Sequence, residues 1–223
     1  MQVLVNAAVS VDGKLSTRRR EQVAISGPDD FDRVDSLRAD SDAVMVGVGT
    51  VLADDPSLTV DDPARIDART ERGATPQPAR VVADSRLRTP ADATVLDDAA
   101  ETYLLANDAV SAGSVAEKAS EGVTVLTTGS DRVDLTVALD RLENHGIERL
   151  MVEGGGELIF SLFSAGLVDE LSVFVGSMVI GGREAPTLAD GEGFLEEFPA
   201  LHLDGADQID DGVLLQYDVV SDG

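Results

Sequence analysis

A run of three glycines stands where a strand is expected to meet a helix, and it is the strongest candidate ligand-binding feature of the sequence. Glu153 precedes the glycines (residues 154–156), and an apolar segment with helical spacing follows over residues 157–165. Glycines let a ligand approach the backbone closely, and the N–H groups that open a helix can bind a phosphate. The pattern is not the dinucleotide fingerprint, because Ile159 stands where a third spaced glycine is required. A tight strand–helix turn without a ligand is the alternative.

A second glycine-containing segment, GVGT (residues 47–50), follows another expected strand. Thr50 and Asp54 are four residues apart and would therefore share one face of a helix. The hydroxyl and backbone N–H of a threonine can bind a phosphate or a ribose, and a carboxylate can accept from a sugar hydroxyl. The alternative is a helix-capping role for Asp54 or Asp55.

Two further turns carry charged residues at the ends of expected strands. Asp12-Gly13-Lys14 closes the first strand, and Lys14 could neutralise an anionic substrate. Asp-Gly is also a common turn dipeptide, which is the simpler interpretation. Asp84-Ser85-Arg86 ends a later strand in the same way and has the same two interpretations.

The composition excludes several classes of chemistry. The 223 residues include 17 Lys+Arg and 42 Asp+Glu, for a net charge of −25, and no cysteine. Without cysteine there is no disulfide, no thiolate metal site and no cysteine nucleophile, and no other metal site is expected. The negative charge argues against nucleic-acid binding, because phosphates are repelled. Neither a membrane span nor a signal peptide is indicated, so a cytoplasmic protein is expected.

The charged residues themselves are unusual. Only Lys14 and Lys118 are lysines, beside many aspartates. A carboxylate-coated, lysine-poor surface keeps a protein soluble in concentrated salt, where repulsion is screened. We therefore expect a halophilic protein that unfolds on dilution.

Expected strands and helices alternate along the chain, which predicts one α/β domain over residues 1–223. Helical spacing marks residues 28–39 and 134–145, while the polar, proline-rich residues 61–79 are expected to form a surface excursion. The expected strands are Val3–Val9, Ala43–Val48, Arg80–Ala83, Thr102–Ala106, Val123–Thr127, one on each side of the helix after the glycine run, and two around an Asp210-Asp211-Gly212 turn.

Five segments, in order, resemble the riboflavin-biosynthesis reductases of the stand-alone archaeal and fungal type. They are VSVDGKLST (9–17), SDAVMVGVGTVLADDPSLTV (41–60), RVVADSRLRTP (80–90), LMVEGGGELIFSLFSAGLVDELSVFV (150–175) and IGGREAPTLADGEGF (180–194). In bifunctional bacterial relatives a zinc deaminase precedes this domain. None is expected here, because Met1 adjoins the first strand and cysteine is absent.

The resemblance implies a dihydrofolate-reductase-like α/β fold: a mixed, mostly parallel sheet flanked by helices, with an antiparallel C-terminal edge. It implies NADPH as hydride donor, a homodimer, and a phosphorylated pyrimidine substrate. The implied reaction converts the ribosylamino side chain of 2,5-diamino-6-ribosylamino-4(3H)-pyrimidinone 5′-phosphate to the ribitylamino form. The alternatives are the deaminated pyrimidinedione or a dihydropteridine as substrate, or a non-catalytic nucleotide-binding module.

The resemblance also assigns residues by matching position. The implied cofactor contacts are Val9, Thr50, Asp54, Ser85, Gly129, Gly154, Gly155, Gly156, Glu157 and Leu158. The implied substrate contacts are Arg38, Leu58, Glu153, Lys14, Asp12 and Gln22. Asp61 stands where some bacterial relatives carry an arginine toward the substrate, so Arg38 or Lys14 is expected to hold the 5′-phosphate. No proton donor is assigned, and the catalytic residues stay unknown.

Overall fold

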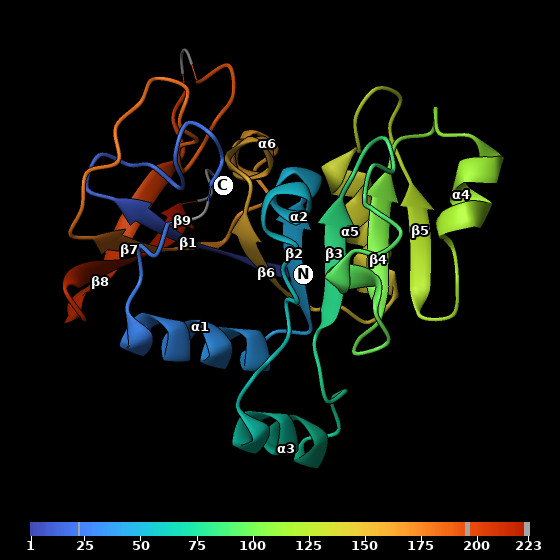
Figure 1. Ribbon diagram of the computed structural model, residues 1–223, viewed down its shortest axis with the longest axis horizontal. Helices are drawn as coiled ribbons and strands as arrows, with labels where there is room; N and C mark the ends of the chain where they lie inside the picture. The colour runs from blue at the N-terminus through green and yellow to red at the C-terminus, as the bar shows by residue number, and fades with distance from the viewer. Residues whose placement is uncertain (22, 195–196, 221–223) are drawn as a thin grey trace. The chain divides into compact units, whose positions relative to one another are not determined.

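The computed structural model describes residues 1–21, 23–194 and 197–220, and the chain divides into two compact units (Figure 1). Unit 1 comprises Met1 and residues Asp35–Met151, and unit 2 comprises Gln2–Val34 and Val152–Gly223. The expectation of one domain over the whole chain remains a prediction.

Unit 1 is built on parallel strands in the order β5-β4-β3-β2. Their apolar side chains contribute to a buried hydrophobic core, in which Val44, Val82 and Leu104 are fully buried. Parallel strands are covered on both faces, which explains why these segments are nearly continuous apolar runs. The bounds are β2 (Ala43–Gly47), β3 (Ala79–Ala83), β4 (Thr102–Ala106) and β5 (Val123–Thr127), close to those expected.

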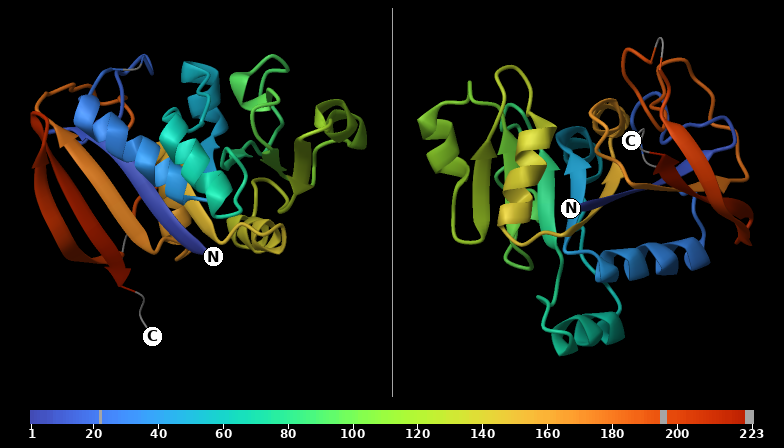
Figure 2. Two further views of the ribbon diagram at one scale, coloured as in Figure 1. Left: turned by 90° about the horizontal axis from the view of Figure 1, so that it is seen from below. Right: turned by 180° about the vertical axis from the view of Figure 1, so that it is seen from behind.

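The helices of unit 1 are α2 (Val48–Asp54), α3 (Pro63–Glu71), α4 (Ala112–Lys118) and α5 (Leu135–Asn144), with a 3₁₀ turn η1 (Thr94–Leu96). The expected helix over 134–145 is confirmed as α5, which lies across one face of β3 and β4 (Figure 2). Asp134 caps it by accepting from the Val137 N–H at 3.1 Å. Its apolar stripe, Leu135, Ala138, Leu139 and Leu142, is buried.

The expected surface excursion over residues 61–79 contains a helix, α3, that the sequence analysis did not predict. Pro63 occupies the first turn, and Asp62 caps the helix by accepting from the Ala64 N–H at 2.8 Å. The buried residue of α3 is not apolar: it is Arg69, 1% exposed. Its guanidinium donates to the carbonyls of Ala39 at 2.6 Å and Ser41 at 2.7 Å. A helix held by polar contacts has no apolar periodicity to reveal it.

Unit 2 contains strands in the order β1-β7-β9-β8. β1 and β7 are parallel, whereas β9 is antiparallel to both β7 and β8, so the expected antiparallel C-terminal edge is confirmed. The bounds of these strands are β1 (Gln2–Ser10), β7 (Glu170–Gly176), β8 (Ala200–Ile209) and β9 (Gly212–Val220). Unit 2 also contains α6 (Gly156–Ser164). Two elements have residues in both units: β6 (Arg149–Gly154) and α1 (Pro28–Asp40).

β8 pairs with β9 along one side, and its side chains are exposed over most of its length. The pairing shifts between Leu203, opposite Tyr217, and Gly205, opposite Gln216. The extra residue, Asp204, marks a β-bulge, which increases the local twist of a strand.

The first turns of α1 dock on the sheet of unit 2 through polar side chains rather than the apolar stripe expected from its spacing. Phe31 is 59% exposed, whereas Asp30 is 1% exposed. Asp30 pairs with Arg33 at 2.8 Å, and Arg33 donates to Asn6 at 2.8 Å and Ser172 at 3.1 Å. A buried ion pair can persist only when its remaining groups are hydrogen-bonded, as they are here.

Within the described residues, no helix has the length and apolar character needed to cross a membrane.

Candidate functional site

The carboxyl ends of the parallel strands in unit 1 carry four of the predicted cofactor residues. α2 begins directly after β2 and bears Thr50 and Asp54. Ser85 follows β3 by two residues, and Gly129 follows β5 by two. Parallel strands end at one edge of a sheet, which is where ligands bind in open α/β folds. The structure therefore places these four residues along the same edge.

Hydrogen bonds join the loops at this edge into one frame. The carbonyl of Ser85 accepts from the Asn107 N–H at 3.1 Å, and the carbonyl of Gly129 accepts from the Asp108 N–H at 2.7 Å. The Ser85 hydroxyl accepts from the Val133 N–H at 3.1 Å, which leaves its own hydrogen to donate. Gly129 has φ +78°, and a Cβ there would lie 2.3 Å from a backbone carbonyl, so only glycine fits.

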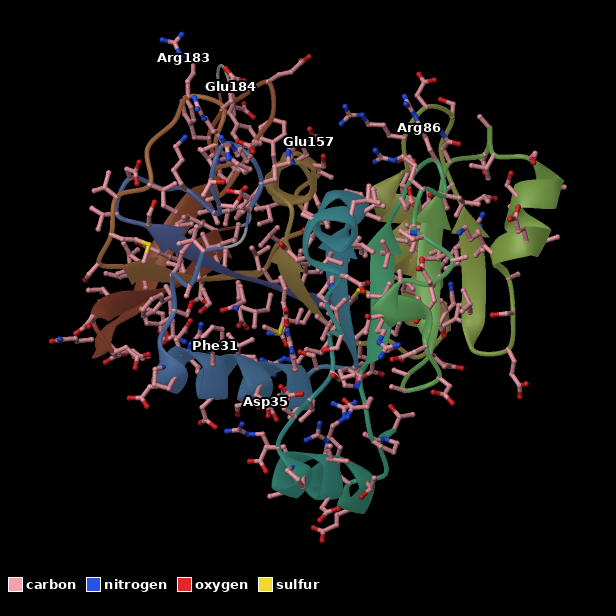
Figure 3. All side chains as sticks on the ribbon, viewed as in Figure 1. Phe31, Asp35, Arg86, Glu157, Arg183 and Glu184 are labelled. Carbon is pink, nitrogen blue, oxygen red and sulfur yellow. The ribbon has the colours of Figure 1, made fainter. Side chains whose placement is uncertain are left out.

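Asp84, which the sequence analysis placed in a strand-end turn without a role of its own, anchors the loop that presents Ser85. It is fully buried, and one carboxylate oxygen accepts from both the N–H and the hydroxyl of Thr89, at 2.7 and 2.8 Å. This closes a tight loop in which Leu87 has φ +52°. Arg86 is exposed at the tip and extends away from the strands (Figure 3). The closed loop thus carries a hydroxyl, on Ser85, and a guanidinium, on Arg86, at consecutive positions.

The two carboxylates at the end of α2 have different roles. Asp55 has φ +43° and accepts from the N–H and the hydroxyl of Thr94, both at 2.8 Å, so it fixes the end of the helix. Desolvation raises the pKa of the neighbouring Asp54. The capping alternative therefore applies to Asp55 and leaves Asp54 available for a ligand.

In unit 2, the glycine run joins β6 to α6. Gly155 has φ +93°, which favours glycine, and Gly156 begins the helix. A Cβ on Gly156 would lie 2.4 Å from the Thr187 carbonyl oxygen and 3.0 Å from an Asp190 carboxylate oxygen. The Asp190 N–H also donates to the Gly156 carbonyl at 3.0 Å. Packing of residues 187–190 therefore requires glycine at 156, whereas phosphate binding by this turn stays a prediction.

Replacing Gly156 by alanine is expected to destabilise the protein, because the new methyl group would collide with rigid backbone. Overpacking of this kind costs about 1–3 kcal/mol, which in a chain of this size lowers the melting temperature by about 2 °C or more. Thermal unfolding followed by circular dichroism in molar KCl measures the shift. Gly113→Ala is the matched control, since its Cβ meets nothing closer than 3.7 Å. Equal melting of Gly156→Ala and wild type would contradict the expected collision.

The other predicted residues of unit 2 lie on several elements. Val9 is buried near the end of β1, opposite Val175. Glu153 is half-buried at the end of β6. In the first turn of α6, Leu158 is buried and Glu157 lies at the surface (Figure 3).

Asp12 and Lys14 both bind the segment that follows β7. The Asp12 carboxylate accepts from the Ser10 hydroxyl at 2.6 Å and from the N–H groups of Ile180 and Gly181 at 3.0 and 2.8 Å. These hydrogen bonds, with that of Ser10 the strongest, lower the pKa of Asp12 to about 2. The Lys14 ammonium donates to the Ala185 carbonyl at 3.1 Å. Their substrate roles stay predictions, and Gln22 lies outside the described residues.

Arg38 and Leu58 lie near each other in unit 1. Arg38 is in the last turn of α1 and donates to the Thr59 carbonyl at 2.9 Å, next to the buried Leu58. Because α1 ends just before β2 begins, the Arg38 backbone lies on the amino side of that strand, whereas Thr50 follows its carboxyl end. The structure therefore does not place Arg38 at the edge that carries Thr50 and Ser85.

The family model of the RibD C-terminal domain matches residues 1–215. This chain belongs to the RibD C-terminal domain family. A relative from Archaeoglobus fulgidus, named 2,5-diamino-6-ribosylamino-4(3H)-pyrimidinone 5′-phosphate reductase, is 47% identical over 87% of this chain and 89% of its own length. A relative of the same name from Methanothermobacter thermautotrophicus is 45% identical over 91% and 89%. The riboflavin biosynthesis protein RibD of Actinobacillus pleuropneumoniae is 34% identical, and this chain spans 57% of it.

Solved structures of the family share the fold. RibD of Acinetobacter baumannii superposes with a TM-score of 0.79 at 24% identity, over 98% of this chain and 58% of that one. The riboflavin biosynthesis reductase Rib7 of Saccharomyces cerevisiae superposes with a TM-score of 0.71 at 18% identity, over 98% and 90%. The expected α/β fold of the dihydrofolate-reductase-like class is confirmed by these neighbours.

Proposed function

We propose that this protein is an NADPH-dependent oxidoreductase of riboflavin biosynthesis. It reduces the ribosylamino side chain of 2,5-diamino-6-ribosylamino-4(3H)-pyrimidinone 5′-phosphate to the ribitylamino form. The observation that carries this is the identity of 45–47% to two archaeal relatives of that name, along nearly the whole length of each. A family-level likeness to RibD alone would not distinguish this substrate from the deaminated one.

The reaction asks the chain mainly to position its reactants. The ribosylamine opens to an imine, and a hydride plus a proton add across the C1′–nitrogen double bond to give the ribitylamine. Bound NADPH supplies the hydride and becomes NADP⁺. The protein must hold donor and acceptor carbons about 3–3.5 Å apart and exclude water.

For the cofactor, we assign Thr50, Asp54, Ser85 and Gly129 in unit 1, and Val9 and the turn 154–158 in unit 2. The frame around Ser85 supports this, because its hydroxyl keeps a hydrogen to donate. NADPH rather than NADH fits the loop that Asp84 closes, because Arg86 there can pair with a 2′-phosphate.

For the substrate, we assign Glu153 to the pyrimidinone ring, since a carboxylate accepts from its N–H groups. Arg38 suits the 5′-phosphate, because a guanidinium binds phosphate in a fork. The remaining residues that we assign to substrate binding are Lys14, Asp12, Leu58 and Gln22. We further propose that the protein is cytoplasmic and that it forms a homodimer. Light scattering in molar KCl tests the oligomeric state directly.

The deciding experiment is an assay of NADPH oxidation in molar KCl with the freshly made diamino substrate. We expect turnover with that substrate and not with its deaminated analogue, and a lower rate with NADH. A site hydrogen-bonded to an amino group rejects the analogue that lacks it strongly. Turnover of the deaminated compound alone, or none by a protein shown to be folded by circular dichroism, would overturn the proposal.

A further inference from the structure

Residues 58–62 of unit 1 form a segment whose backbone is held from one side by α1. The Asp35 carboxylate accepts from the Asp61 N–H at 2.6 Å and from the Asp62 N–H at 3.2 Å. One turn later on the same helix, Arg38 donates to the Thr59 carbonyl at 2.9 Å. Two side chains of one helix face therefore hold the backbone of this segment at Thr59, Asp61 and Asp62.

Gln77 holds the remaining residue. Its amide oxygen accepts from the Val60 N–H at 2.7 Å, and its amide nitrogen donates to the Val60 carbonyl at 3.0 Å. Each residue from 59 to 62 thus has a backbone group bound by a side chain from another part of unit 1. A loop that needed only to connect two helices would not require such complete anchoring.

The anchored segment begins with a strained residue. Leu58 has φ +56° and is 1% exposed, so a bulky side chain is buried in a left-handed conformation. Such strain persists only where the surroundings over-determine it, and it gathers at functional sites. Asp55 and Leu87 also have positive φ, and they lie next to Asp54 and close to Ser85.

Asp35 is suited to hold this conformation. Burial by itself raises the pKa of its carboxyl group, but the bonds from Asp61, Arg65 and Asp62 outweigh that and lower it. The carboxylate is therefore ionised at neutral pH and accepts at both oxygens. Arg65 donates to one of those oxygens at 2.9 Å, a contact that does not involve the segment backbone.

We propose that Asp35 is a positioning residue for the pyrimidine phosphate: it holds residues 58–62 and thereby keeps Leu58 in its strained conformation. This rests on the proposed function, in which Leu58 lies against the substrate. Asp35 itself does not touch the substrate.

The test compares Asp35→Ala and Asp35→Asn with Arg65→Ala as the matched control. Loss of two hydrogen bonds to a charged group is expected to raise the KM for the pyrimidine phosphate by about tenfold or more in Asp35→Ala. Asp35→Asn keeps one carbonyl acceptor and should show a smaller rise. The Kd for NADPH and kcat should stay within about twofold, because neither depends on this segment. Arg65→Ala removes the ion pairs of Arg65 with the Asp35 and Asp62 side chains but leaves the bonds from Asp35 to the segment backbone, so its KM should stay near that of wild type.

Hydrogen exchange gives a readout that does not depend on turnover. The amides of Asp61 and Asp62 should exchange faster in Asp35→Asn than in Arg65→Ala. The proposal is overturned if a folded Asp35 variant keeps the wild-type KM, or if Arg65→Ala raises KM equally. If Asp35→Ala does not fold, Asp35→Asn decides. Absence of turnover in the wild type would instead count against the proposed function, and the exchange rates would still show whether Asp35 holds the segment.

Discussion

Replacement of Glu153 by glutamine is expected to lower kcat/KM for the pyrimidine phosphate at least tenfold. Glu153 ends β6, half-buried and next to the glycine run. A carboxylate there accepts at both oxygens, whereas the glutamine amide turns an N–H group toward the N–H groups of the ring. Hydrogen bonds to charged groups contribute about 1.5–3 kcal/mol, which corresponds to a loss of about 10- to 150-fold.

Steady-state kinetics and a separate titration of NADPH measure this effect. The Kd for NADPH should not change, because Glu153 is assigned to the pyrimidine. Glu148→Gln is the matched control: it removes the same charge just before β6, from an exposed side chain. Wild-type kinetics in Glu153→Gln would remove the residue from the site, and an equal loss in Glu148→Gln would point to net charge instead.

Dilution from molar to low KCl is expected to unfold the protein. With a net charge of −25, carboxylates across the surface repel one another, and each adds to the free energy of the folded state. Salt limits this repulsion to neighbours, since the Debye length is about 3 Å at 1 M and about 10 Å at 0.1 M. The melting temperature should therefore rise steeply with KCl.

Thermal melts across a KCl series measure this dependence, and a series in an uncharged osmolyte separates screening from general stabilisation by excluded solutes. A pH titration at low salt adds a second check, because protonating part of the surface carboxylates should reduce the repulsion. A melting temperature that is flat across the KCl series would contradict the expectation.

The elements that depend on apolar runs were predictable from the sequence. β2, β4 and β5 are nearly continuous apolar segments, and α5 has an apolar stripe between an Asp cap and a glycine. α3 and the first turns of α1 were not predictable in this way, because they dock through arginine and aspartate side chains. In a chain with so many acidic residues, nothing local separates a buried aspartate from a solvated one.

The same difference applies to the candidate site. Glycine spacing and strand ends located Thr50, Ser85 and the turn after β6, since these signals lie within a few residues. Asp35 was missed, because its partners Asp61 and Asp62 are brought to it by folding, and Asp84 was singled out only as part of a strand-end turn. Both side chains bind backbone next to a predicted site residue: Asp35 beside Leu58, and Asp84 in the loop that presents Ser85.

The bulge in β8 has a consequence for how this protein avoids aggregation. An edge strand of ten residues, most of them exposed, offers its backbone to any other strand, and charged side chains normally discourage such pairing. In concentrated salt that electrostatic protection reaches only a few ångströms. The extra residue at Asp204 instead interrupts the edge by its shape, which no ion can screen. This edge of the sheet thus has one protection against pairing that does not depend on charge.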